Sequence, residues 1–189
     1  MSLMNSSNLI SHILGYLRIT KKLDSINNNI INIESIIEDC LTELEEINSF
    51  KYIYRKYNHK LEFLEDCAYD SLFEKSDDLY YLIACTLGYE VEQRIKYLSM
   101  TDSTKMVIMD ACASAYLEEK ANEYEKSNLD VNNLGNYRRF CPGYGESKLS
   151  DLRCIYNEIK AEKIGIILNE QFMMSPQKSM LGIVKKKIN

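Results

Sequence analysis

The chain has 189 residues, of which 46% are hydrophobic, and it carries a formal net charge of −5. This hydrophobic content is enough for one packed core and excludes an intrinsically disordered chain. The acidic balance argues against a nucleic-acid-binding protein, which would present clustered lysine and arginine to the phosphates. No stretch approaches the roughly 20 apolar residues of a transmembrane helix, and the N-terminus lacks the pattern of a signal peptide. We therefore expect a soluble, cytoplasmic protein with no membrane partner.

Six cysteines and two histidines are dispersed along the chain, with no Cys-x-x-Cys pair. This spacing provides no zinc ligand set, so no metal site is predicted. His12 and His59 stand in unrelated segments, which gives little support to Cys–His nucleophilic catalysis. Most of the cysteines lie in apolar helical patterns and are expected to be reduced core residues.

The N-terminal third alternates between helical and extended patterns. Met1–Leu3, which precede Met4, are interpreted as an added leader, and a helix is predicted from Ser7 to about Arg18. Residues 24–32 are rich in asparagine and form either a linker or a helix lead-in. An apolar stripe predicts an amphipathic helix over residues 33–47. Aromatic alternation predicts one or two strands within residues 51–64, and the continuous apolar run 79–87 predicts a buried strand.

A helix is predicted after Gly88, followed by the longest helix, which is capped by Thr101 or Asp102 and runs to about Glu125. One face of this long helix is an ordinary core stripe. The neighbouring face carries mostly small residues around one carboxylate, Glu118. A ligand or another backbone could approach Glu118 closely, although a solvated surface glutamate is the alternative. The small-residue face consists of Val107, Ala111, Ser114, Glu118 and Ala121.

Turn-forming residues are concentrated in the last part of the chain. Five of the seven glycines and both prolines follow Leu134, so irregular backbone is expected there. We predict a loop over residues 126–136, a helix over 150–162, and two short strands over 164–168 and 180–184. The order of elements predicts an α+β fold, with helices packed around a small antiparallel sheet. Residues 1–32 and the domain 33–189 are expected to form one structural unit.

The segment Arg-Arg-Phe-Cys-Pro-Gly-Tyr-Gly at residues 138–145 is least typical of a packed core. Its glycines and proline predict an exposed loop whose backbone amides can meet a ligand. Arginine is suited to bidentate recognition of a carboxylate, and tyrosine adds a flat apolar surface with a hydroxyl group. A turn with surface arginines remains the alternative from spacing alone.

Arg139, Gly143 and Tyr144 form an Arg-x-x-x-Gly-Tyr motif, and the segment Leu168–Gly182 contains Glu-x-Phe-x-x-x-Pro-x-x-Ser. In this order, the two segments resemble the activation domain of cobalamin-dependent methionine synthase, including stand-alone proteins that consist of this domain. The resemblance extends from about Ile13 to Val184. It implies an activation domain-like α+β fold.

The resemblance also implies that the chain binds S-adenosylmethionine as a methyl donor. Arg139 would contact the methionyl carboxylate, and Glu118 the methionyl amino group. The backbone around Cys141 and Gly143 and the side chain of Tyr144 would line the ligand. Cobalamin would be carried by a partner, namely a cobalamin-binding protein or methionine synthase modules, and a flavodoxin-type protein would supply the electron. Because cobalt would attack the methyl group, no catalytic residue is expected in this chain.

Two other functions remain open at the level of sequence. The chain could be an interaction scaffold that keeps the fold and docks on a cobalamin-carrying partner without binding a small molecule. It could also be an independent methyltransferase, although no side chain is recognisable as a general base. The resemblance favours a component of a methionine synthase system over a complete enzyme.

Overall fold

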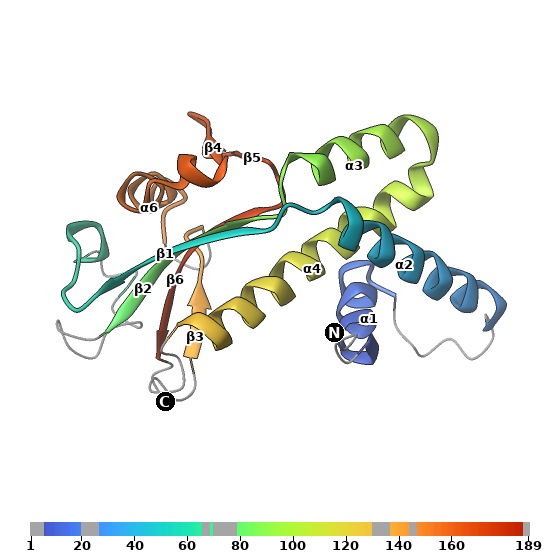
Figure 1. Cartoon of the computed structure of the whole chain (residues 1–189), viewed down its shortest axis with the longest axis horizontal. Coiled ribbons are helices and arrows are strands. Elements are labelled where there is room, and N and C mark those ends of the chain that lie inside the picture. Colours follow the sequence, from blue (N-terminus) through green and yellow to red (C-terminus); the bar gives the residue numbers. More distant parts are fainter. Residues whose placement is uncertain are drawn as a thin grey trace.

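The computed structural model describes residues 6–19, 27–65, 69, 79–129, 137–143 and 147–186. Its centre is a four-stranded antiparallel sheet in the order β1-β2-β6-β3 (Figure 1). Strand β6 therefore lies between β2 and β3, and among the described strands β3 is at one edge of the sheet. The strands are β1 (Lys51–Tyr57), β2 (Tyr80–Thr86), β3 (Tyr137–Phe140) and β6 (Ser179–Lys186).

Four helices lie together on one side of the molecule, and the longest, α4, crosses this face of the sheet (Figure 1). Asp102 begins α4 as its N-cap, because its side chain accepts a hydrogen bond of 2.9 Å from the Lys105 amide. Helices α1, α2 and α3 pack against α4. Their bounds are α1 (Ser6–Tyr16), α2 (Asn27–Ile47), α3 (Tyr89–Thr101) and α4 (Ser103–Asn128).

The other face of the sheet is covered by α6 (Asp151–Ile159) and by short 3-10 helices. These are η1 (Glu62–Glu65) and η3 (Ala161–Ile164). Beside them, β4 (Ile167–Leu168) and β5 (Met174–Ser175) form a separate two-stranded antiparallel pair. Helices on both faces of an antiparallel sheet confirm the predicted α+β class.

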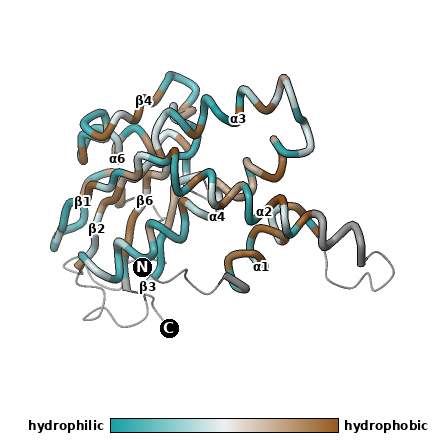
Figure 2. The backbone as a smooth tube through the Cα atoms, turned by 45° about the vertical axis from the view of Figure 1, so that its right-hand side comes forward, coloured by the Kyte–Doolittle hydropathy of each residue, from teal (hydrophilic) through white to brown (hydrophobic). Residues whose placement is uncertain are grey.

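Every residue of β2 is buried, so this strand has no solvent-facing side. Alternate side chains point to opposite faces of a strand. Accordingly, Tyr81 and Ile83 belong to the core with α2 and α4, whereas Leu82 and Ala84 belong to the core with α6. In Figure 2, β2 and β6 lie between α6 on one side and α4 on the other. The sheet thus separates two hydrophobic cores.

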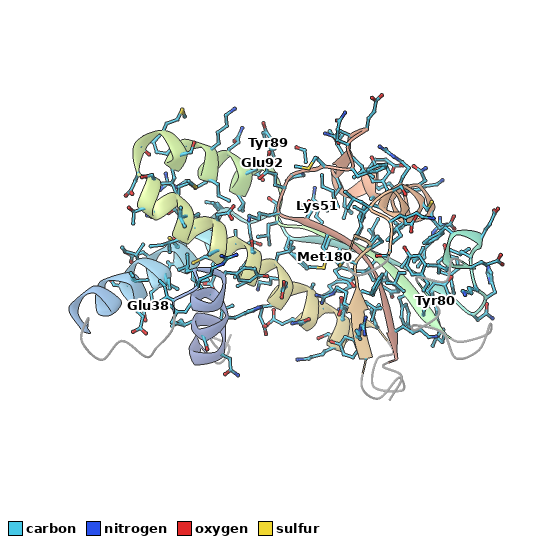
Figure 3. All side chains as sticks on the ribbon, turned by 180° about the vertical axis from the view of Figure 1, so that it is seen from behind. Glu38, Lys51, Tyr80, Tyr89, Glu92 and Met180 are labelled. Carbon is cyan, nitrogen blue, oxygen red and sulfur yellow. The ribbon has the colours of Figure 1, made fainter. Side chains whose placement is uncertain are left out.

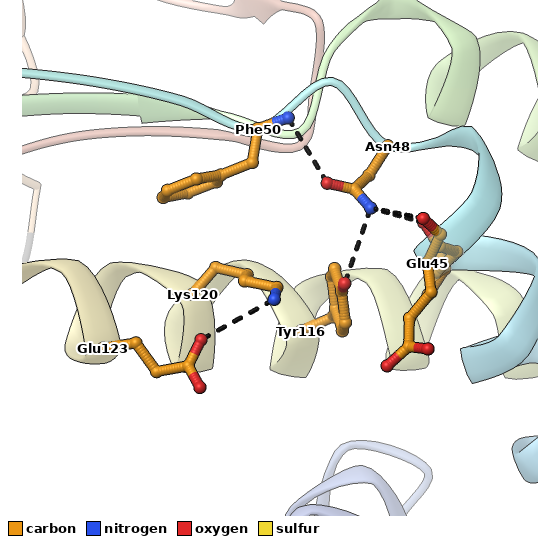
Figure 4. A network of polar contacts seen from close by, with 7 residues as sticks. Glu45, Asn48, Phe50, Tyr116, Lys120 and Glu123 are labelled. Atoms are coloured by element: carbon orange, nitrogen blue, oxygen red, sulfur yellow. Dashed lines mark hydrogen bonds and ion pairs between the residues drawn. The ribbon is translucent and has the colours of Figure 1, made fainter. Parts of the chain in front are cut away.

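Asn48 joins the end of α2 to the start of β1 and to α4. Its side-chain amide donates to the carbonyls of Leu44 and Glu45, at 2.7 and 3.2 Å, and to the Tyr116 hydroxyl at 3.4 Å. Its carbonyl oxygen accepts from the Phe50 amide at 3.3 Å (Figure 4). Asn48 therefore satisfies carbonyl groups that the helix end leaves open and fixes the direction in which β1 leaves α2.

The turn that leads into β6 is held by α3 and α4. Glu92, near the start of α3 (Figure 3), accepts a hydrogen bond of 3.0 Å from the Gln177 amide and one of 3.4 Å from the Ser175 hydroxyl. The Lys178 ammonium contacts Asp110 and Ser114 of α4, both at 2.8 Å. These contacts set the position at which β6 enters the sheet.

Most predicted elements are present, and the differences are local. The region 51–64 contains one strand, followed by a 3-10 helix, because the alternation stops at Tyr57. The helix predicted over 150–162 ends at Ile159, where Lys160 adopts a left-handed conformation with φ 58°. Of the strand predicted over 164–168, only the last two residues are a strand, namely β4. Helix α4 extends to Asn128, into the predicted loop, whose residues 130–136 lie outside the described part of the chain.

The segment around Arg139 differs more from its prediction. Residues expected to begin an exposed loop, Arg138 to Phe140, instead form most of β3, because pairing with β6 gives them an extended backbone.

Within the described residues, no helix combines the length and the apolar character that a bilayer-crossing helix needs.

Candidate functional site

Strand β3 directs Arg139 toward α4. Arg139 pairs with Val184 of β6, which belongs to the core that contains α4. The next residue, Phe140, packs against the opposite core with α6. Strand alternation therefore explains why Arg139 faces inward and its neighbour Arg138 remains exposed.

The Arg139 guanidinium makes a bidentate contact with Glu125, near the end of α4. Its Nε and Nη2 atoms donate to the two Glu125 oxygens at 2.8 and 2.9 Å, and Nη2 also donates to Asn122 Oδ1 at 2.8 Å. The Tyr52 hydroxyl donates to Glu125 Oε1 at 3.0 Å. The Glu125 side chain is fully buried, whereas 13% of the Arg139 side chain is exposed. Nη1 has no hydrogen bond to any described residue, so it keeps donor capacity.

This network has a clear electrostatic signature. Burial tends to lower the pKa of Arg139, but the hydrogen bonds and the charge of Glu125 outweigh it and raise the pKa. Burial raises the pKa of Tyr52, and the neighbouring Glu125 charge raises it further. Arg139 is therefore held as a cation and Tyr52 as a neutral hydrogen-bond donor.

Arg139 and Lys178 contact the same face of α4. Five polar residues follow one another on this face at intervals of three or four, which places them along one side of a helix. We call them the polar row: Asp110, Ser114, Glu118, Asn122 and Glu125. Lys178 contacts the first two members, and Arg139 contacts the last two. Glu118 is the central member, between the two cations.

Glu118 receives its described contacts from α1. The Tyr16 hydroxyl donates to Glu118 Oε1 at 2.6 Å, and His12 Nε2 lies 3.7 Å from Oε2. The Glu118 side chain is 36% exposed and the His12 side chain 48%. The predicted binding carboxylate is therefore accessible from solvent and is covered in part by the N-terminal helix.

Cys141 and Gly143 follow directly after β3. Burial raises the pKa of the Cys141 thiol to about 11; the carboxylates of Glu118 and Glu125 add to the increase, and Arg139 opposes it. Gly143 has a φ of +94°, which favours glycine, and its amide donates to the Ser147 hydroxyl at 3.1 Å. The chain therefore turns sharply after β3. Tyr144, the last residue of the predicted motif, lies outside the described residues.

Gly182 in β6 makes room for the end of β3. A β-carbon at this position would lie 2.8 Å from the Phe140 carbonyl oxygen and 3.2 Å from Cys141 Sγ. Both distances are too short for an undisturbed contact. Glycine at position 182 thus allows β3 and Cys141 to approach β6 closely.

Arg139, Cys141 and Gly143 lie on β3 and in the turn after it, and Arg139 contacts the α4 face that carries Glu118. Three members of the Arg139 network, Tyr52, Asn122 and Glu125, are absent from the sequence-based site. The spacing of Glu118, Asn122 and Glu125 could have revealed the two α4 residues. No local signal could have revealed Tyr52, which is 73 positions from Glu125.

Among the described residues, no group of three or more His, Cys, Asp or Glu side chains could hold a metal ion. The five cysteines in this part of the chain are free thiols. Cys40, Cys85 and Cys112 are fully buried.

Comparison with protein-family models gave no match, and comparison with curated proteins gave none either. Among solved structures, the chain is similar to the crystal structure of the MetH reactivation domain bound to AdoHcy. The TM-score is 0.69 at 15% sequence identity, and the similarity covers 87% of this chain and 67% of that one. This likeness establishes that the two share a fold.

Proposed function

We propose that the chain binds S-adenosylmethionine and helps to remethylate cobalamin on a methionine synthase or a related corrinoid protein. The observation that carries this proposal is the fold shared with a reactivation domain that was crystallised with AdoHcy, a close analogue of S-adenosylmethionine. The Arg-x-x-x-Gly-Tyr motif adds support, because its arginine contacts Asn122 and Glu125 of the polar row.

The charges of the polar row fit the methionyl part of this ligand. The row contains three carboxylates, of which Asp110 and Glu125 each contact a lysine or arginine side chain. The third, Glu118, contacts Tyr16 and His12. In this proposal, Glu118 receives the ligand ammonium group and Nη1 of Arg139 donates to the ligand carboxylate.

The spacing supports the same assignment. Glu118 and Asn122 are one helical turn apart, a rise of about 6 Å, and Asn122 contacts the Arg139 guanidinium. An amino-acid head group carries its ammonium and its carboxylate on the same carbon atom. It therefore needs a carboxylate and a guanidinium at about this separation. Cys141, Gly143 and Tyr144 are proposed to line the remainder of the ligand.

The chemistry of methyl transfer belongs to the ligand and to the partner. S-adenosylmethionine supplies the methyl group, and a cobalamin carried by another protein receives it. This chain would bind and orient the donor, which requires no nucleophile or general base of its own. A reduced flavodoxin-type protein is the proposed electron source.

Calorimetric titration with S-adenosylmethionine and with AdoHcy tests the proposal. We expect binding by the wild-type chain and at least about tenfold weaker binding by Arg139→Lys, which keeps the charge but loses the bidentate geometry. Arg138→Lys is the matched control, because Arg138 is the adjacent exposed arginine, and it should bind as the wild type does. Absence of heat with either ligand at millimolar concentration would contradict the proposal.

A second function is a scaffold that docks on a cobalamin-carrying partner without binding a small molecule. One observation favours it: Arg139 and Glu118 already have partners within the chain, Glu125 and Tyr16. A ligand must then compete with, or add to, existing contacts. The scaffold predicts co-purification with a cobalamin-binding protein, no heat with either ligand, and an unchanged complex for Arg139→Lys.

A further inference from the structure

Glu125 has properties that distinguish it from the other carboxylates of the polar row. Its side chain is fully buried, whereas 36% of the Glu118 side chain and 47% of the Asp110 side chain are exposed. A buried carboxylate is costly unless its oxygens are hydrogen-bonded. Here both oxygens accept from Arg139, and Oε1 also accepts from the Tyr52 hydroxyl.

Arg139 is oriented by these contacts. A guanidinium has five N–H groups in a fixed plane. The Nε proton and both Nη2 protons are used by Glu125 and Asn122. The guanidinium plane is thereby held through Nε and Nη2, and the two Nη1 protons remain for a further acceptor. Long side chains otherwise lose considerable conformational entropy when they bind a ligand.

We infer that Glu125 is a positioning residue that sets the affinity of Arg139 for the ligand carboxylate, with Tyr52 holding Glu125 in place. The inference rests on the proposed function, because it names the part of the adenosyl ligand that this network recognises. Glu125 does not touch the ligand. It fixes the plane of Arg139, so that only the Nη1 side is offered to a second carboxylate.

The test compares two ligands that differ in one group. AdoHcy carries the carboxylate, and the corresponding 5′-(3-aminopropylthio)adenosine keeps the adenosine, sulfur and amine but lacks it. The affinity for each is measured calorimetrically with the wild type, Glu125→Gln and Tyr52→Phe. Glu123→Gln is the matched control, because it makes the same change on the same helix and Glu123 contacts Lys120, not Arg139 (Figure 4).

We expect the wild type to prefer AdoHcy over the amine. Glu125→Gln should weaken AdoHcy binding about tenfold, the effect of losing one charge-assisted contact, and should change amine binding by less than about twofold. Tyr52→Phe should give a smaller loss in the same direction, and Glu123→Gln should give none. Circular dichroism and thermal melting establish that each variant is folded.

Two results would overturn the inference. One is a folded Glu125→Gln that keeps the wild-type preference for AdoHcy. The other is an equal loss for both ligands, which would indicate a general structural role. If Glu125→Gln does not fold, an unchanged preference in Tyr52→Phe decides against the inference. Failure of the wild type to bind either ligand would instead contradict the proposed function itself.

Discussion

Arg139 and Glu125 form a bidentate ion pair between the edge strand β3 and the last turns of α4; the Glu125 side chain is fully buried and the Arg139 side chain is 13% exposed. The pair joins the edge strand to the longest helix of the fold. Burying two charges gives little net stability compared with apolar residues, but removing one partner leaves the other charge uncompensated. The pair therefore has structural consequences that are separate from any ligand.

Arg139→Ala should lower the free energy of unfolding by about 3–5 kcal/mol, because it leaves the buried Glu125 without its counter-ion. Urea denaturation measures the loss. The double variant Arg139→Met with Glu125→Leu should regain most of it, since it removes both charges. Arg138→Ala, which alters the exposed neighbour, should change stability by less than about 0.5 kcal/mol. Equal losses for Arg138→Ala and Arg139→Ala would contradict this reading.

The contact between Tyr16 and Glu118 should contribute modestly to the docking of α1. The hydrogen bond is 2.6 Å long, but both side chains are accessible to solvent. A double-mutant cycle with Tyr16→Phe and Glu118→Gln should give a coupling below about 1 kcal/mol and above zero. Tyr97→Phe is the control, because Tyr97 is similarly exposed and the described contact of its ring is with the Arg94 side chain. Absence of coupling between Tyr16 and Glu118 would contradict a stabilising role for this hydrogen bond.

Gly182→Ala should destabilise the sheet edge. The added methyl group would lie 2.8 Å from the Phe140 carbonyl oxygen, so β3 would have to move away from β6. We expect a loss of about 1–3 kcal/mol in chemical denaturation and weaker AdoHcy binding. Gly15→Ala is a matched control in α1, where a β-carbon meets no atom within 4 Å. That variant should be stabilised by about 0.5–1 kcal/mol, and a loss as large as that of Gly182→Ala would refute the steric explanation.

The Cys141 thiol should react slowly with iodoacetamide at pH 8. Burial raises its pKa from 9.0 to about 11, and at pH 8 this leaves roughly one hundredth of the thiolate of an unperturbed cysteine. Exposed Cys154 should be alkylated first. The alkylation rate of Cys141 should rise between pH 8 and pH 10, as measured by mass spectrometry of peptides. Because the unfolded thiol ionises at lower pH than the folded one, the contribution of Cys141 to stability is complete below about pH 9 and is lost as the pH rises toward 11. Equal labelling of both cysteines at pH 8 would contradict the prediction.

The sequence predicted the helices and the buried strand well, because their patterns are local. The apolar stripe of residues 33–47 and a capping residue at Thr101 or Asp102 each identify an element from a few neighbouring residues. Strand β3 could not be predicted in this way. It has four residues, two of them arginines, and its extended backbone depends on pairing with β6, more than 40 positions later.

Some site residues could be predicted and others could not, because the contacts of the latter depend on residues far apart in the sequence. Glu118 and Arg139 were identified from their unusual surroundings and from the resemblance, and their ligand roles remain predictions. Glu125 lay at the expected end of a helix, where a charged residue is ordinarily solvated. Its burial depends on Tyr52 and Arg139, which come from two different strands.

The strand order β1-β2-β6-β3 also constrains when the site can form. Within the described residues, β3 is attached to the sheet through β6 alone. During synthesis, the segment that carries Arg139 leaves the ribosome about forty residues before residues 179–186, which is a difference of a few seconds. Until β6 is inserted beside β2, β3 has no partner strand that would orient Arg139, and Glu125 has no fixed counter-ion. Formation of this surface is therefore tied to the pairing of β6 with β2 and β3.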